Sequence, residues 1–271
     1  MRFGSSTTAS GAVLLLLVTT IATAAEDRDP ANAASLSGAS RATPVVVELF
    51  SSEGCSSCPP AETFLRDFAS RSRGAGVPLV LEYHVDYWNY LGWTDPFSRP
   101  EFTERQTAYA KAFGDGRLYT PEIVVQGRSA LPSRSAATLE ERIRREAAEP
   151  RADVVVSLRD GMAHVHVSHA KATPEDAVDV LLAVAESGLR SEVRAGENRG
   201  ETLVHAPVVR RLVTLGAVTS GAFDGGARLD VDPAWQPRNV RLVALVQGRR
   251  SRRILGAASV PLNPPTGEVE K

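Results

Sequence analysis

The sequence is poor in sulfur and in aromatic side chains, and it has no excess of charge of one sign. Its 271 residues include two cysteines, two methionines and 6% aromatic residues. A zinc site built from two cysteine pairs is therefore excluded. The formal net charge is -1, so we expect no general electrostatic attraction to nucleic acid or to an anionic membrane.

Several motifs that bind cofactors are also missing. The chain has no phosphate-binding loop, no Gly-x-Ser-x-Gly elbow and no dinucleotide fingerprint, so we expect no nucleotide, no flavin and no other cofactor. Three histidines, His164, His166 and His169, stand close together in the sequence. Strict alternation along a strand would place His169 on the opposite face from the other two. We therefore expect no resident metal ion.

No hydrophobic run is long enough to span a membrane as a mature helix. The apolar stretch at residues 12–18 is short, follows Arg2 and precedes Ala22-Thr-Ala24. This pattern predicts a signal peptide over residues 1–24, with an N-terminal membrane anchor as the alternative. We expect an exported protein, periplasmic or secreted, in an oxidising compartment and free of the membrane after cleavage. Residues 25–43 are polar and aperiodic, as is typical of a flexible linker.

The rest of the chain divides into two halves with different patterns. Residues 44–150 alternate apolar, β-branched runs with amphipathic segments, which predicts an α/β domain with helices on the faces of a sheet. Strands are expected at 45–50, 77–84 and 123–126, and helices at 60–72, 101–113 and 139–147. Residues 151–271 contain short β-rich runs separated by Gly, Pro, Asn and Asp. They predict a β-rich, sandwich-like domain.

The two cysteines form the motif Cys55-Ser-Ser-Cys58 between the first expected strand and the first expected helix. A strand-to-helix turn brings the first sulfur near the positive end of the helix, which favours its thiolate. Cys55 would then attack a substrate disulfide, and Cys58 would resolve the mixed disulfide. Pro59 and Pro60 disfavour helical angles in the residues before them. We therefore expect the regular helix to begin near Pro60, with the pair in the preceding loop.

Two other uses of the cysteine pair stay open. The pair can be a structural disulfide, although so small a loop gives little stability through chain entropy. The chain would then be a non-catalytic binding module whose β-rich half does the work. The pair can also bind or deliver copper together with a nearby histidine such as His84, because thiolates and imidazole suit copper.

At these residues the sequence resembles a known family. Residues 46–61, 84–97, 119–121 and 196–200 are similar to the exported thioredoxin-like proteins known as domain of unknown function 1223, within the thioredoxin superfamily. The resemblance implies a thioredoxin-like fold for residues 44–150. With the cysteine pair, it favours dithiol–disulfide exchange with an exported protein or a small thiol. It implies neither a particular substrate nor a redox partner.

The resemblance also assigns roles around the cysteines. In thioredoxin-like folds a cis proline begins the strand beside the redox pair, and Pro121 in Tyr119-Thr120-Pro121 fits that place. Its neighbours Tyr119 and Thr120 would bind an extended substrate segment. Thioredoxins also have a buried acid that relays protons to the second cysteine. Glu48 on the first expected strand is the candidate, and a glutamate facing water is the alternative.

Aromatic residues gather in residues 84–97. Tyr87 and Trp88 are among them, and they would line a groove for an extended peptide or an apolar ligand. The alternative is a packed loop that covers the sheet.

Overall fold

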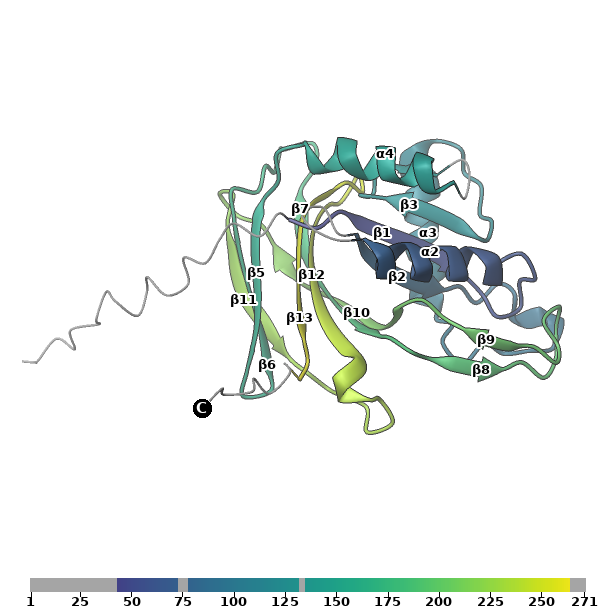
Figure 1. Ribbon diagram of the computed structural model, residues 1–271. Helices are drawn as coiled ribbons and strands as arrows, with labels where there is room; N and C mark the ends of the chain where they lie inside the picture. The colour runs from purple at the N-terminus through teal and green to yellow at the C-terminus, as the bar shows by residue number, and fades with distance from the viewer. Residues whose placement is uncertain (1–42, 73–77, 132–134, 264–271) are drawn as a thin grey trace, which may run out of the picture. The chain divides into compact units, whose positions relative to one another are not determined.

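The computed structural model describes residues 43–72, 78–131 and 135–263 (Figure 1). The expected signal peptide, and the expected linker up to residue 42, lie outside the described residues. Within the described part of the chain, no helix has the length and apolar character needed to cross a membrane.

The first half alternates strands and helices as the sequence predicts. Its strands are β1 (Val46–Ser51), β2 (Leu79–His84), β3 (Glu122–Val125) and β4 (Ser129–Ala130), and its helices are α2 (Pro59–Arg71), α3 (Pro100–Phe113) and α4 (Ala136–Ala147). A short 3-10 turn covers Asn89–Leu91. β1 runs parallel to β2 and antiparallel to β3, and β3 forms a hairpin with β4. Every residue of β1 is buried, as expected for a strand with helices on both faces.

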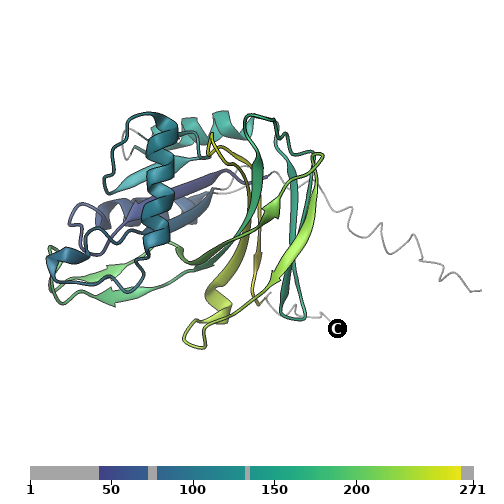
Figure 2. The same cartoon turned by 180° about the vertical axis from the view of Figure 1, so that it is seen from behind.

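The helices cover opposite faces of these strands. α2 and α4 pack on the face that carries Val47 and Leu49, and α3 packs on the face that carries Val46 and Phe50. Figure 1 shows α2 and α4 in front of the sheet, and Figure 2 shows α3 from the other side. The alternation of side chains along β1 therefore decides which helix each residue meets.

The second half is made mostly of strands. They are β5 (Asp153–Arg159), β6 (Met162–Ser168), β7 (Val178–Glu186), β8 (Arg190–Glu192), β9 (Thr202–Val204), β10 (Val208–Ala217), β11 (Phe223–Arg228), β12 (Val240–Gly248) and β13 (Ile254–Pro261), with a 3-10 turn at Pro237–Asn239. The apolar run from Val178 forms β7, which is buried along almost its whole length.

Strands from both halves form one eight-stranded sheet, in the order β13-β12-β7-β10-β2-β1-β3-β4. β10 joins the halves by pairing Val208 with Glu82 of β2. A three-stranded sheet, β11-β6-β5, packs against the outer strands of the large sheet. The fold is thus a mixed α/β arrangement in which most elements are strands. Strands from before and after residue 150 are hydrogen-bonded neighbours in the same sheet.

Candidate functional site

The cysteine pair lies in the turn between β1 and α2. Cys55 and Cys58 form a disulfide with their Cα atoms 5.5 Å apart. Cys58 is the N-cap of α2, with Pro59 and Pro60 in its first turn. The helix thus begins one residue earlier than the sequence predicts, since proline is favoured at the start of a helix. The pair therefore lies at the positive end of α2, where the helix dipole is strongest.

The disulfide is covered although the residues between its cysteines are not. Cys55 is 1% exposed and Cys58 is fully buried, whereas Ser56 and Ser57 are exposed. The Sγ of Cys55 lies 3.3 Å from the Oγ of Ser57. A partner that reaches the sulfurs must therefore move some of the covering residues.

The segment that covers the cysteine loop belongs to the second half of the chain. It is the connection between β8 and β9, which contains residues 196–200. The carboxylate of Glu197 accepts hydrogen bonds from the backbone N–H (3.0 Å) and the hydroxyl (2.8 Å) of Ser56. Asn198 donates from Nδ2 to the carbonyl oxygens of Glu53 (2.8 Å) and Cys55 (3.1 Å). Both halves of the chain thus build this site.

The expected cis proline is confirmed, because the Thr120–Pro121 bond is cis. The register of β1 against β3 pairs Phe50 with Glu122, so Pro121 lies at the same end of the sheet as the cysteine loop. The backbone on either side of Pro121 is therefore placed beside the turn that carries the disulfide.

Trp88 connects the cis-proline segment to the cysteine loop. Its indole Nε1 donates a hydrogen bond to the Thr120 hydroxyl over 2.8 Å. On the other side, a Cβ added to Gly54 would lie 3.0 Å from the Cβ of Trp88. That approach leaves little room for a side chain at position 54. Thr120 and Trp88 are therefore brought to the site as expected.

Tyr87 and Tyr119 are held through a common partner, Gln106 of α3. Tyr87 donates its hydroxyl to Gln106 Oε1 over 3.1 Å, and Gln106 Nε2 donates to the carbonyl of Tyr119 (2.7 Å) and to Glu122 (2.8 Å). Tyr119 is 40% exposed, so its ring is open to a ligand, whereas Tyr87 packs against α3. Burial raises the pKa of Glu122 to about 7.

Glu48 does not lie with the cysteines, so its expected role as base for Cys58 requires correction. It projects from β1 on the face covered by α3, whereas Cys58 begins α2 on the opposite face. Its carboxylate is held by Arg105, at 2.7 Å from Nη2, and by the hydroxyl of Tyr109. Glu48 is fully buried, so the alternative of a glutamate facing water is wrong as well.

Behind the cysteine loop, six titratable side chains that the sequence analysis did not group are buried together. They are Glu53, Glu62, Glu82, His84, Asp95 and His205, and each is at most 2% exposed. We call them the buried acid–histidine cluster. Glu82 and His84 project from the same face of β2, two residues apart. Two titratable residues at alternate positions of an otherwise apolar strand were the sequence signal that could have indicated this cluster.

The cluster reaches the start of α2 through Glu62, which lies four residues after Cys58. The hydroxyl of Ser51 donates to Glu62 Oε1 over 2.5 Å. Glu62 Oε2 lies 3.1 Å from Nδ1 of His205. In the other direction, the backbone N–H of Glu53 donates to Asp95 over 2.8 Å. The cluster therefore supports both sides of the cysteine loop.

Proton affinities in the cluster are set by burial and by mutual charge. Burial, aided by the charge of Glu62, raises the pKa of Glu82 to about 7. Burial acts to lower the pKa of His205, yet hydrogen bonds to Glu53 and Glu62 outweigh it and raise the value to about 9. The pKa of His84 is raised well above its usual value, because Asp95 and Glu82 likewise outweigh burial. Both imidazoles therefore hold a proton more tightly than a free histidine does.

The geometry also bears on the alternative of copper binding. Both ring nitrogens of His84 are directed at carboxylates, with Nδ1 2.7 Å from Asp95 and Nε2 3.1 Å from Glu82. In this arrangement neither ring nitrogen of His84 is directed at the sulfurs of Cys55 and Cys58.

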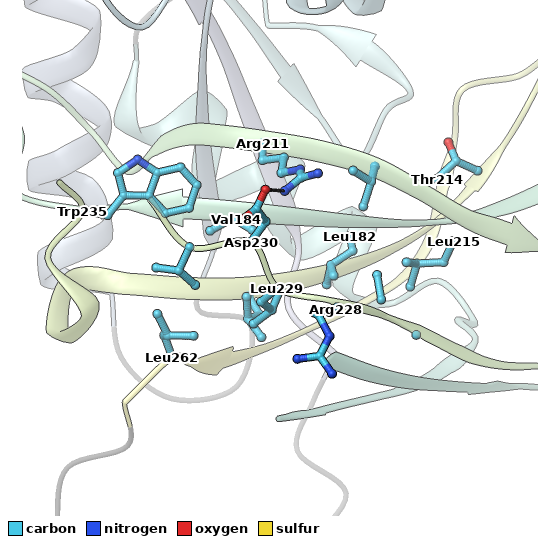
Figure 3. A pocket seen from close by; sticks show the side chains of 15 residues that line it. Leu182, Val184, Arg211, Thr214, Leu215, Arg228, Leu229, Asp230, Trp235 and Leu262 are labelled. Carbon is cyan, nitrogen blue, oxygen red and sulfur yellow. Dashed lines mark ion pairs between the residues drawn. The ribbon is translucent and has the colours of Figure 1, made fainter. Parts of the chain in front are cut away.

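A separate cavity of about 180 Å³ lies in the second half of the chain (Figure 3). Aliphatic side chains such as Leu182 and Leu242 line it together with Trp235, and an ion pair between Arg211 and Asp230 (3.6 Å) stands beside them. None of the residues around the disulfide lines this cavity. It is therefore not part of the candidate site.

Together, the fold and the site define a mixed α/β protein with a disulfide at the start of a helix and a cis proline in the neighbouring strand. The family described as a protein of unknown function, DUF1223, matches residues 46–247. The chain belongs to this family.

Solved structures that are similar to the chain include the following two. A crystal structure from Agrobacterium tumefaciens, determined by a structural genomics consortium, has 27% sequence identity and a TM-score of 0.68, over 85% of this chain and 99% of that one. HBP35 of Porphyromonas gingivalis has 15% identity and a TM-score of 0.62, over 85% of this chain and 80% of that one. Its similarity therefore concerns the fold alone. Among curated proteins, none matches.

Proposed function

We propose that the protein is an exported thiol–disulfide oxidoreductase in which residues 44–150 form a thioredoxin-like domain. The order β2-β1-β3-β4 supports this assignment, together with α2 and α4 on one face and α3 on the other. Residues 151–271 form the β-rich domain, which supplies the segment over the cysteine loop. The sequence pattern at residues 1–24 supports export.

The observation that carries the proposal is the position of Cys55 and Cys58 at the start of α2, beside a cis proline. The reduced protein has two thiols. The thiolate of Cys55 attacks one sulfur of a substrate disulfide, and the other substrate sulfur leaves as a thiolate. Cys58 then attacks the sulfur of Cys55 and releases the second substrate thiol. Two electrons pass to the substrate, and the Cys55–Cys58 disulfide forms again.

The substrate side of the site would be the segment Tyr119-Thr120-Pro121. Its backbone lies at the same end of the sheet as the disulfide, and Trp88 holds it in place through Thr120. The Tyr119 carbonyl already accepts from Gln106, so an extended peptide that contains a cysteine would pair with the backbone of Thr120. The proposed partner is therefore an exported protein with a disulfide or dithiol, or a small thiol.

The experiment is capture of the mixed disulfide. Reduced Cys58→Ser is mixed with oxidised glutathione, and the adduct is located by mass spectrometry. A glutathione adduct on Cys55 supports the mechanism, with Cys55→Ser as the control in which Cys58 alone is available. An adduct that forms no faster than on an unfolded peptide containing the same motif contradicts it.

A structural disulfide is the second candidate, and the burial of both sulfurs favours it. The protein would then act through its β-rich half as a binding module. Slow reduction by excess dithiothreitol, at the rate of global unfolding, would support this candidate.

A further inference from the structure

We propose that Glu82, His84 and His205 bind a divalent transition-metal ion of the zinc type, with the carboxylate of Glu53 beside His205. One possible ligand atom from each of Glu82, His84 and His205 lies within 4.8 Å of the other two. All four side chains are at most 1% exposed. Within the described part of the chain, no other group of three such residues comes this close together.

Two pairs of atoms have the spacing of neighbouring ligands, and His205 Nδ1 lies 3.9 Å from Glu82 Oε1. His84 Nε2 is 3.1 Å from Glu82 Oε1, and His205 Nε2 is 3.2 Å from Glu53 Oε1. These four atoms are buried and lie in two pairs at ion-pair distance, but the contacts do not have hydrogen-bond geometry. Two ligands each about 2.0 Å from a tetrahedral zinc ion stand about 3.3 Å apart. An ion between these atoms would satisfy groups that are otherwise costly to bury.

The outer nitrogen of each imidazole is oriented by a second carboxylate. His84 Nδ1 lies 2.7 Å from Asp95, and His205 Nδ1 lies 3.1 Å from Glu62. Histidines that bind metals commonly donate the remaining ring N–H to a carboxylate, which fixes the tautomer and turns the other nitrogen toward the metal. His84 thereby turns Nε2 toward Glu82. For His205, Nδ1 also lies 3.9 Å from Glu82 Oε1, and Nε2 is directed at Glu53.

An apolar ring closes the cluster from one side. The ring of Phe97 lies edge-on to His84 (5.4 Å between ring centroids) and to His205 (5.3 Å), and the two imidazoles are 5.0 Å apart. Nitrogen and carboxylate oxygen are suitable zinc ligands, and a closed site is typical of a structural ion. We therefore expect a resident ion that is loaded as the protein folds.

The ion would connect segments that are distant in the sequence. Glu53 follows β1, Glu82 and His84 belong to β2, and His205 follows β9 in the second half of the chain. Glu53, whose carboxylate lies 3.2 Å from His205 Nε2, connects this site to the backbone that leads into Cys55. No sulfur is among the ligands, so this inference and the redox proposal can fail separately.

The test is the metal content of the full chain with its disulfide intact. The chain has five histidines, so the variant His164→Asn/His166→Asn/His169→Asn keeps only His84 and His205. Wild type and this variant are produced in medium with zinc, and separately with cobalt. After buffer exchange, metal is measured by mass spectrometry and cobalt by its visible spectrum. Free thiols are assayed to confirm that the cysteines are oxidised.

We expect about one equivalent of metal in the wild type and in the triple variant, and a cobalt spectrum without a thiolate charge-transfer band. His205→Gln and Glu82→Gln should each lose most of the metal. If either variant does not fold, the other provides the comparison. Folded wild type with less than about a tenth of an equivalent of either metal would overturn the proposal. Retention of the ion by a folded Glu82→Gln/His205→Gln variant would also overturn it.

Discussion

The ion pair between Glu48 and Arg105 is a sensitive point of the fold, because it is buried between β1 and α3. Both side chains are at most 3% exposed. Arg105 also donates to Gln247 of β12 over 3.0 Å and lies over the rings of Tyr83 and Tyr109. The pair therefore ties the first half of the chain to the second.

Removing one partner leaves the other charge buried and uncompensated. Such a loss typically costs about 3–5 kcal/mol, which is a large part of a total stability of about 5–15 kcal/mol. We expect Arg105→Met to lower the free energy of unfolding by this amount. Glu48→Gln/Arg105→Met should recover about 2 kcal/mol or more relative to Arg105→Met, because it leaves no buried charge.

The assay is denaturant unfolding of wild type, both single variants and the double variant, followed by fluorescence. Rates of exchange with glutathione are measured on the same proteins from pH 6 to pH 9. Because Glu48 lies on the opposite face of the sheet from α2, the pH profile of Glu48→Gln should match that of the wild type. Additive stability losses would refute the ion-pair reasoning, and a shifted profile would restore Glu48 as base for Cys58.

Three further predictions concern the surroundings of the disulfide. Asn198→Ala removes two hydrogen bonds to the cysteine loop. We therefore expect a loss of about 1–3 kcal/mol and faster reduction by dithiothreitol. Asn239→Ala, which removes a side-chain hydrogen bond to Gln236 instead, is the control, and equal rates of reduction in the two variants would contradict the covering role. Gly54→Ala brings a methyl group to 3.0 Å from the Cβ of Trp88. We expect the free energy of unfolding to fall by about 1–3 kcal/mol and the melting temperature to fall by several degrees. An unchanged melting temperature would contradict the close packing of Gly54 against Trp88. For Glu122, burial raises the pKa from 4.5 to about 7. The protonated Glu122 side chain is favoured in the folded protein, so its contribution to stability is fully present below the unfolded-state pKa of 4.5. That contribution is lost as the pH rises through about 7. The free energy of unfolding of the wild type relative to Glu122→Gln should therefore fall between about pH 4.5 and pH 7, and a constant difference would contradict the raised pKa.

The elements of the first half could be predicted because local signals agree with the tertiary structure. The apolar run that forms β1 and the prolines that begin α2 are visible in the sequence. The cis Thr120–Pro121 bond follows from the resemblance to thioredoxin-like folds. β11, with the sequence Phe-Asp-Gly-Gly-Ala-Arg, could not be predicted, because its glycines weaken the β signal and its pairing with β6 supplies the order.

The face on which Glu48 projects could not be predicted either. A strand with a helix on each face is apolar on both, so its pattern does not tell which residues meet α2. The buried acid–histidine cluster was missed for a different reason. Its members come from β1–α2, β2, the loop before α3 and the segment after β9, and only tertiary folding brings His205 to Glu62 and Glu53.

The redox equilibrium of Cys55 and Cys58 tests the central proposal most directly. The protein is equilibrated in glutathione buffers of graded potential, and the free thiols are counted after alkylation. The account predicts a midpoint between roughly -120 and -270 mV, the span of known exchange proteins. A midpoint below about -300 mV would mark a structural disulfide and contradict the proposed function.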